Sequence, residues 1–169
     1  MRLEDLNGLR SDDAAREFLR CCGSTRWVRA MAAARPFGNV AAVDEAADRI
    51  FDTLAPADWL EAFAAHPRIG ESSRAGRADA AEDWSAEEQG SASATSDTVR
   101  DRLASRQRDY EARFGYIFII CATGRRAPEM LAALEQRMPN APADELRIAS
   151  EEQRKITHLR IAKLLAATA

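Results

Sequence analysis

The amino-acid sequence predicts an all-α protein, a single-domain irregular helical bundle, on three observations. The 169-residue chain is rich in alanine and arginine and only 7% aromatic, a composition that favours helices. Stretches with helical patterning are bounded by prolines and capping residues along most of its length. The one segment that resembles a strand, YIFIICATG at 116–124, has no clear partner with which to form a sheet.

Four helices are predicted before residue 66. They cover Ser11 to Cys22, Trp27 to Ala34, Val40 to Leu54, and Pro56 to Ala65. Asp12 and Asp13 lie near the start of the first helix, Pro36 stops the second, and Pro56 fits the first turn of the fourth. The small, polar and charged residues from Gly70 to Asp83 then predict a long loop.

Four further segments are predicted after this loop. Ser85 and Glu88 match the S-x-x-E capping box, so a long helix should begin there and run to Phe114, where Gly115 ends it. Tyr116 to Gly124 is interpreted as a buried connector or a short helix. Two more helices are expected, Ala127 to Met138 and Pro142 to Ala166, separated by Pro139 and Asn140.

Composition excludes several classes of partner. The net charge of −3 leaves no basic excess to neutralise phosphates, which argues against nucleic acid. The sequence contains neither a signal peptide nor an apolar run of about 20 residues that could span a membrane. Its three cysteines show no CxxC or zinc-type spacing, so we expect reduced thiols, no metal site, and a soluble cytoplasmic protein.

The final predicted helix directs one charge toward the interior. In helical projection, Arg160 falls within the apolar stripe defined by Ile156 and Leu164, whereas His158 points the opposite way and is interpreted as a solvated surface residue. An interior guanidinium costs several kcal/mol unless something compensates its charge. Arg160 should therefore bind an anion, form an internal salt bridge, or extend its head to water.

The helix after the loop shows a similar anomaly at its start. Its apolar side is defined by Val99, Leu103, Tyr110 and Phe114. Ser85, Glu88 and Gln89 project onto that same side. Capping alone accounts for Ser85 and Glu88 but leaves Gln89 unexplained, so the three residues indicate one wall of a small polar pocket at a helix N-terminus.

His66, one of only two histidines, lies where the fourth predicted helix must end, because Pro67 disfavours helical geometry in the residue before it. The helix dipole favours a protonated imidazole at that position. His66 is thus either a hydrogen-bonded core histidine or a group that donates a proton near neutral pH.

Four blocks of sequence resemble one known family. They are HPRIGE at 66–71, WSAEEQ at 84–89, FGYIFIICATGR at 114–125 and ELRIASEEQRKITHLRIAKLL at 145–165. Together, in this order and spacing, they resemble the 2-oxo-4-hydroxy-4-carboxy-5-ureidoimidazoline (OHCU) decarboxylases of urate breakdown. The resemblance extends over essentially the whole chain.

This resemblance implies an all-α, homodimeric carboxy-lyase without a cofactor, which converts the small anionic imidazoline OHCU to (S)-allantoin and carbon dioxide. It implies catalytic roles for His66, Glu88 and Arg160, with His66 as the proton donor. The substrate-binding residues that it implies are Pro67, Ser85, Ala86, Glu87, Gln89, Phe118, Ile119, Ile120, Cys121 and Ala122.

Two other interpretations remain open from the sequence. The first is a noncatalytic helical interaction module, in which Arg160 pairs directly with Glu88 and the inward polar residues only cap helices. The second is an enzyme acting on a neighbouring imidazoline intermediate, for instance a hydrolase. Hydrolysis would need an activated water, and the sequence shows no metal cluster to activate one.

Overall fold

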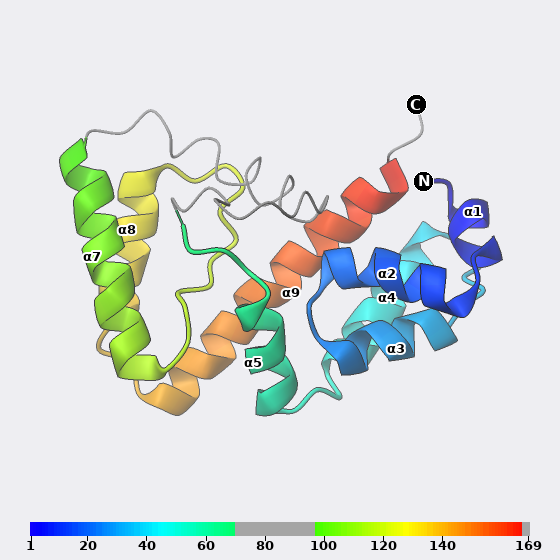
Figure 1. Cartoon of the computed structure of the whole chain (residues 1–169), viewed down its shortest axis with the longest axis horizontal. Coiled ribbons are helices and arrows are strands. Elements are labelled where there is room, and N and C mark those ends of the chain that lie inside the picture. Colours follow the sequence, from blue (N-terminus) through cyan, green and yellow to red (C-terminus); the bar gives the residue numbers. More distant parts are fainter. Residues whose placement is uncertain (70–96, 167–169) are drawn as a thin grey trace. The chain divides into compact units, whose positions relative to one another are not determined.

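A computed structural model describes residues 1–69 and 97–166, which form eight helices and no strand (Figure 1). The helices are α1 (Leu3–Gly8), α2 (Ser11–Cys21), α3 (Thr25–Ala33), α4 (Val40–Phe51), α5 (Pro56–Ala64), α7 (Asp97–Phe114), α8 (Ala127–Arg137) and α9 (Pro142–Ala166). The predicted all-α class is confirmed. No helix in these two ranges is long and apolar enough to cross a membrane.

The predicted helices are present, with small shifts at their ends. α3 begins at Thr25, earlier than expected, because the Ser24 hydroxyl caps it by accepting the Trp27 N–H at 3.3 Å. α4 ends at Phe51, earlier than expected, because Thr53 and Leu54 donate their N–H groups to turn-type partners. The helix expected from residue 85 is confirmed over α7, and its first part lies outside the described residues.

The helix α1 is not among those predicted from the sequence, because it is too short to show apolar periodicity. The Asp5 carboxylate accepts the Arg2 N–H at 3.2 Å near its start, and Leu6 is wholly buried. At the C-terminal end of α1, the Arg35 guanidinium donates to the carbonyls of Leu6 at 2.7 Å and Leu9 at 2.8 Å. A side chain from a later segment thus supplies hydrogen-bond donors to carbonyls at the end of this short helix.

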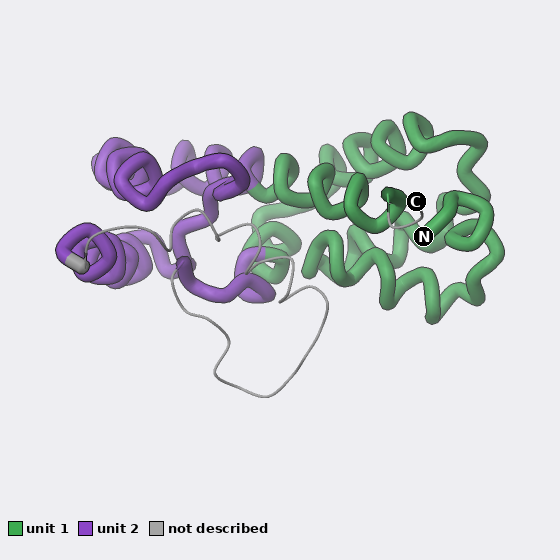
Figure 2. Tube along the Cα trace, turned by 90° about the horizontal axis from the view of Figure 1, so that it is seen from above, with its two compact units in different colours: residues 1–62, 153–169 green, residues 63–152 purple. Residues whose placement is uncertain are grey.

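Backbone proximity divides the chain into two compact units, which Figure 2 colours separately. Unit 1 comprises residues 1–62 and 153–169, and unit 2 comprises residues 63–152. The helix α9 contributes to both, with Glu152 the last residue in unit 2 and Gln153 the first in unit 1. The single-domain organisation expected from chain length stays a prediction.

Unit 1 has an apolar core to which α2, α3 and α4 contribute. The Phe18 ring meets the Trp27 ring edge-on, with 5.9 Å between centroids. The Trp27 indole N–H is also satisfied, because it donates to the Ala47 carbonyl at 3.3 Å. The late part of α9 adds the buried residues Ile156, Ile161 and Leu164.

Unit 2 has its own core, in which α7 and α8 pack side by side (Figure 1). The core includes Leu103 and Tyr110 of α7 and Met130 and Leu134 of α8, all buried. The apolar side predicted for α7 is therefore confirmed. Unit 2 also contains the early part of α9, up to Glu152.

Candidate functional site

His66 lies just after α5, which ends at Ala64. The His66 N–H donates to the Phe63 carbonyl at 3.1 Å, so the chain makes one tight turn as it leaves the helix. His66 and the adjacent Pro67 are both partly exposed. The prediction that this imidazole lies at a helix C-terminus is confirmed.

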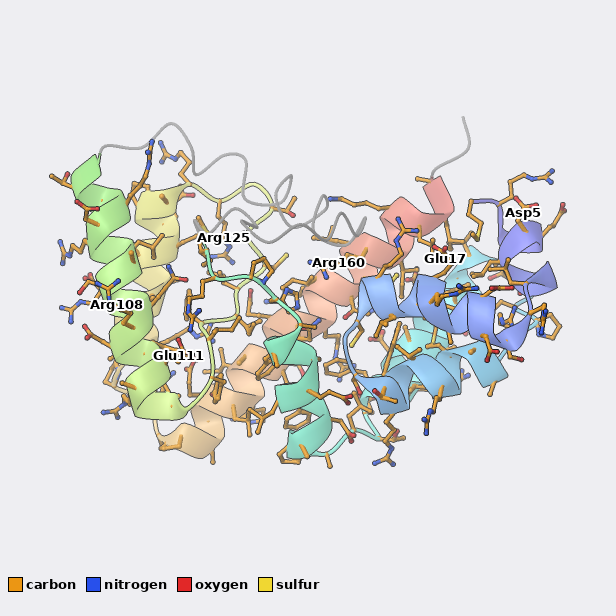
Figure 3. The ribbon with its side chains drawn as sticks, in the orientation of Figure 1. Asp5, Glu17, Arg108, Glu111, Arg125 and Arg160 are labelled. Carbon is orange, nitrogen blue, oxygen red and sulfur yellow. The ribbon has the colours of Figure 1, made fainter. Side chains whose placement is uncertain are left out.

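Contacts on both sides hold the His66 segment within unit 2. Before it, the buried Phe63 ring lies 5.4 Å from the Tyr116 ring, centroid to centroid. After it, the Arg68 guanidinium donates at 2.8 and 3.1 Å to the carboxylate of Glu111 of α7, a residue that Figure 3 labels. These contacts restrict the backbone around His66, which is what a group with a fixed reaction geometry requires.

Gln107 strengthens this attachment. Its side-chain carbonyl accepts the Ile69 N–H at 3.0 Å, and its side-chain amide donates to the Ile69 carbonyl at 3.0 Å. Gln107 is only 5% exposed. Gln107 is not among the predicted site residues, although it lies on the apolar side of α7 between Leu103 and Tyr110. The reasoning that selected Arg160, a polar residue on an apolar stripe, would have found it.

The segment from Tyr116 to Gly124, called the connector below, contains no helix or strand. Phe118, Ile119, Ile120 and Ala122 are buried, and Cys121 is partly exposed. Gly124 has φ +77°, a conformation that favours glycine, and it lies in the turn before α8. The prediction of a buried connector is thus confirmed, and the Phe63–Tyr116 contact places its start beside the His66 segment.

A buried polar network lies beside the connector in unit 2. Glu145, in the first turn of α9, has no exposed surface, and its carboxylate accepts hydrogen bonds from the Tyr110 hydroxyl, Arg137 and the Asn140 amide. Burial, followed by the hydrogen bond to Glu145, raises the pKa of Tyr110, so this hydroxyl stays protonated and continues to donate. This network was not predicted from the sequence.

Arg160 lies on the part of α9 that belongs to unit 1 (Figure 3). It is 5% exposed, which confirms that its guanidinium is directed inward. Its Nη1 lies 3.5 Å from the Arg20 carbonyl oxygen. Burial raises the pKa of the neighbouring Cys21 and Cys22 thiols to about 12 and about 11, although the Arg160 charge acts in the opposite direction. The thiols around Arg160 are therefore neutral.

His158 differs from its prediction as a solvated residue. It is half-buried in unit 1, where Nδ1 lies 3.1 Å from Asp44 and Nε2 lies 2.8 Å from Asp48 of α4. Burial by itself would lower the pKa of His158, but the hydrogen bonds and charges of Asp48 and Asp44 outweigh it and raise that pKa. Projection of α9 alone could not show that α4 presents two carboxylates to this face.

The described chain thus contains part of the predicted site. Unit 2 holds His66, Pro67 and the connector residues 118–122, and unit 1 holds Arg160. Ser85, Ala86, Glu87, Glu88 and Gln89 lie outside the described residues. Within residues 1–69 and 97–166, no group of three or more His, Cys, Asp or Glu side chains could hold a metal ion.

Comparison with known proteins gives a consistent result. The model of the family described as OHCU decarboxylase matches residues 7–162. The uric acid degradation bifunctional protein TTL of Arabidopsis thaliana is 42% identical over 149 residues, which cover 88% of this chain and 46% of that protein. The chain therefore spans about half the length of that relative.

Two other relatives match over nearly their full length. The 2-oxo-4-hydroxy-4-carboxy-5-ureidoimidazoline decarboxylase of Haloferax volcanii is 28% identical over 164 residues, covering 96% of this chain and 95% of that protein. The crystal structure of an OHCU decarboxylase in the presence of (S)-allantoin superposes with a TM-score of 0.78 and 40% identity, covering 89% of this chain and 98% of that one.

Proposed function

The chain belongs to the OHCU decarboxylase family, and from this premise we propose that it converts OHCU to (S)-allantoin and carbon dioxide in urate breakdown. One observation carries the proposal: the family match spans residues 7–162, and relatives named for this activity align with the chain over nearly their whole length. The placement of His66 at the end of α5, beside the connector, supports it further.

The reaction is a loss of carbon dioxide followed by proton addition. In OHCU the carboxylate is attached to a ring carbon next to an imine-type C=N. When this C–C bond breaks, the electron pair flows into the C=N, whose nitrogen takes a proton. The ureido-bearing carbon then gains a proton as the hydroxyl loses one and becomes a carbonyl. The substrate supplies its own electron acceptor, so the protein must orient it, stabilise charge and deliver a proton.

His66 is the proposed proton donor. Addition of the proton to one face of the ureido-bearing carbon sets the configuration of allantoin, so the donor must approach from one side only. The tight turn after α5 and the contacts of Phe63, Arg68 and Ile69 restrict the backbone that carries this imidazole. A donor on a restricted backbone can deliver its proton with one handedness.

Glu88 and Arg160 are the other proposed catalytic residues. Glu88 orients His66 or binds the hydroxyl and ureido N–H groups, while Ser85 and Gln89 bind the remaining polar edge of the substrate. Arg160 binds an oxygen of the anionic substrate and keeps its contact as charge moves into the ring, since a grip on the leaving carboxylate would stabilise the ground state. The burial of Arg160 supports this role, because a desolvated guanidinium attracts anions strongly.

The handedness of the product tests the proposed function. OHCU is generated from urate with the upstream enzymes, and allantoin formation is followed by circular dichroism. Spontaneous decay gives a racemate, whereas the enzyme should give the S enantiomer at a rate proportional to its concentration. A folded protein that leaves both the rate and the racemic outcome unchanged is what the noncatalytic interaction module predicts, and it would overturn the proposal.

A homodimeric state and a cytoplasmic location are further proposals. The family resemblance supports the dimer, and the cysteine content supports a reducing compartment. Light scattering combined with gel filtration measures the mass in solution. A mass equal to that of one 18.6 kDa chain at micromolar concentration would contradict the dimer.

A further inference from the structure

Two side chains bind the backbone of the connector on either side of Ile120. Arg137 of α8 donates from Nη1 to the Ile119 carbonyl at 2.8 Å. Glu152 of α9 accepts the Cys121 N–H at 2.8 Å. Both side chains are largely buried, with Arg137 9% and Glu152 8% exposed, so water competes little for these hydrogen bonds.

These two contacts determine where the polar groups of Ile120 point. The peptide bonds of this segment are trans, and a trans peptide unit is planar, with its C=O and N–H directed oppositely. The Ile119 carbonyl shares its plane with the Ile120 N–H, and the Cys121 N–H shares its plane with the Ile120 carbonyl. The Ile120 N–H therefore points away from Arg137, and the Ile120 carbonyl points away from Glu152.

Arg137 is itself held in place from other directions. Its Nε donates to the wholly buried Glu145 at 2.8 Å, and its guanidinium carbon lies 4.5 Å from the centre of the Phe118 ring. One planar guanidinium thus contacts a carboxylate, an aromatic face and a carbonyl together. A lysine has a single ammonium group and could not make all three contacts.

We propose that Arg137 and Glu152 are positioning residues, which hold the two peptide groups flanking Ile120 so that the Ile120 N–H and carbonyl bind the ureide edge of the substrate. This inference rests on the proposed function. A ureide carries N–H groups beside C=O groups, so one backbone donor and one backbone acceptor on a single residue complement it. Backbone groups held at both neighbouring peptides bind such a ligand without first becoming ordered.

The proposal distinguishes an acceptor role of Glu152 from a role of its negative charge. Glu152→Gln keeps a side-chain oxygen that can accept the Cys121 N–H, whereas Glu152→Met removes the acceptor at similar length. We expect Glu152→Met to raise the KM for OHCU and the Kd for (S)-allantoin about tenfold, as the loss of one well-placed hydrogen bond implies. Glu152→Gln should stay within about threefold of wild type.

Arg137→Lys provides the second variant, because it keeps a positive charge near Glu145 and loses the planar fork. Its KM should also rise about tenfold. Glu129→Met is the matched control: Glu129 of α8 accepts the Arg126 N–H at 2.8 Å, so its loss should lower the melting temperature without changing KM. Melting temperatures are measured for every variant, together with KM and product binding by calorimetry.

Three results would overturn the positioning role. The first is a folded Glu152→Met with unchanged KM, and the second is a Glu152→Gln as impaired as Glu152→Met. The third is an Arg137→Lys with wild-type KM, which also decides the matter if Glu152→Met does not fold. A wild-type chain without activity on OHCU would instead overturn the proposed function itself, so the two failures are distinguishable.

Discussion

Arg137 and Glu145 form an ion pair almost wholly removed from solvent, with 2.6 Å between Nη2 and the carboxylate oxygen and side-chain exposures of 10% and 0%. Burying two charges costs several kcal/mol, which is offset only when their remaining polar atoms also find partners. Here Tyr110 and Asn140 donate to Glu145, and Ile119 accepts from Arg137. The pair therefore links α7, α8, α9 and the connector.

Removal of one partner of this pair should destabilise the protein strongly. Glu145→Leu leaves the Arg137 charge buried without its carboxylate, and we expect the free energy of unfolding to fall by about 3–5 kcal/mol in urea titrations. Asp144→Asn is the control, because Asp144 and its partner Arg147 are 64% and 71% exposed. Asp144→Asn should lower the free energy of unfolding by no more than about 1 kcal/mol. Equal effects of the two substitutions would contradict this ranking.

The His158 network should make stability depend on pH. Both ring nitrogens of His158 face carboxylates, so the doubly protonated imidazolium is favoured and the pKa of His158 is raised. A raised pKa gives stabilisation that is fully present below the unfolded value of about 6.5 and is lost as pH rises through the folded value. Arg154, which also pairs with Asp48, remains charged throughout this range.

The variant His158→Asn measures this contribution. Its free energy of unfolding should be lower than that of the wild type by up to about 1 kcal/mol near pH 6, where His158 is charged. Near pH 9 the two proteins should be almost equally stable. The estimate is small because the aspartates are nearly half exposed, with 45% and 46% of their side chains accessible. Urea titrations at pH 6 and pH 9 measure the free energy of unfolding of both proteins. A loss of stability in His158→Asn that is larger at pH 9 than at pH 6 would contradict the prediction.

Substitution of His66 tests its proposed role as the proton donor. His66→Asn removes the transferable proton from a half-buried position, so the fold should persist while kcat falls about 10²–10⁴-fold. Circular dichroism in the far ultraviolet measures the helix content and so checks the fold. The circular dichroism signal of allantoin measures the rate of product formation and the handedness of the product. Near-native turnover by a folded His66→Asn protein would remove His66 from the mechanism.

Arg160→Lys tests whether the planar guanidinium binds the substrate. The charge remains but the fork is lost, so the KM for OHCU should rise about tenfold or more. Arg154→Lys is the matched control on the same helix, because Arg154 pairs with Asp48 and Asp52 instead. Unchanged KM and kcat for Arg160→Lys would exclude Arg160 from the site.

Much of the helical architecture could be predicted from the sequence. The bounds of α9 were predicted correctly because Pro142 starts the helix and an apolar stripe continues through Leu164. The inward position of Arg160 followed from the same stripe, since a helical projection depends only on local geometry. In contrast, α1 has six residues, fewer than two turns, and shows no repeat that a projection could detect.

Features that depend on two distant segments could not be predicted in this way. Projection placed His158 on the polar side of its helix, yet α4 supplies Asp44 and Asp48 to that side from residues more than 100 positions earlier. Tyr110 was correctly assigned to an apolar side, but its hydroxyl partner Glu145 comes from another helix. Pairings of this kind are set by tertiary packing, which a single-helix pattern does not contain.

The shared helix α9 has a consequence for protein engineering. Unit 1 is discontinuous, because its last helical stretch begins at Gln153 after the whole of unit 2 has been synthesised. The buried residues Ile156, Ile161 and Leu164 belong to this stretch. A fragment ending at residue 62 would lack them and should be aggregation-prone, whereas a circular permutant that joins 153–169 to the N-terminus would restore a contiguous gene for unit 1.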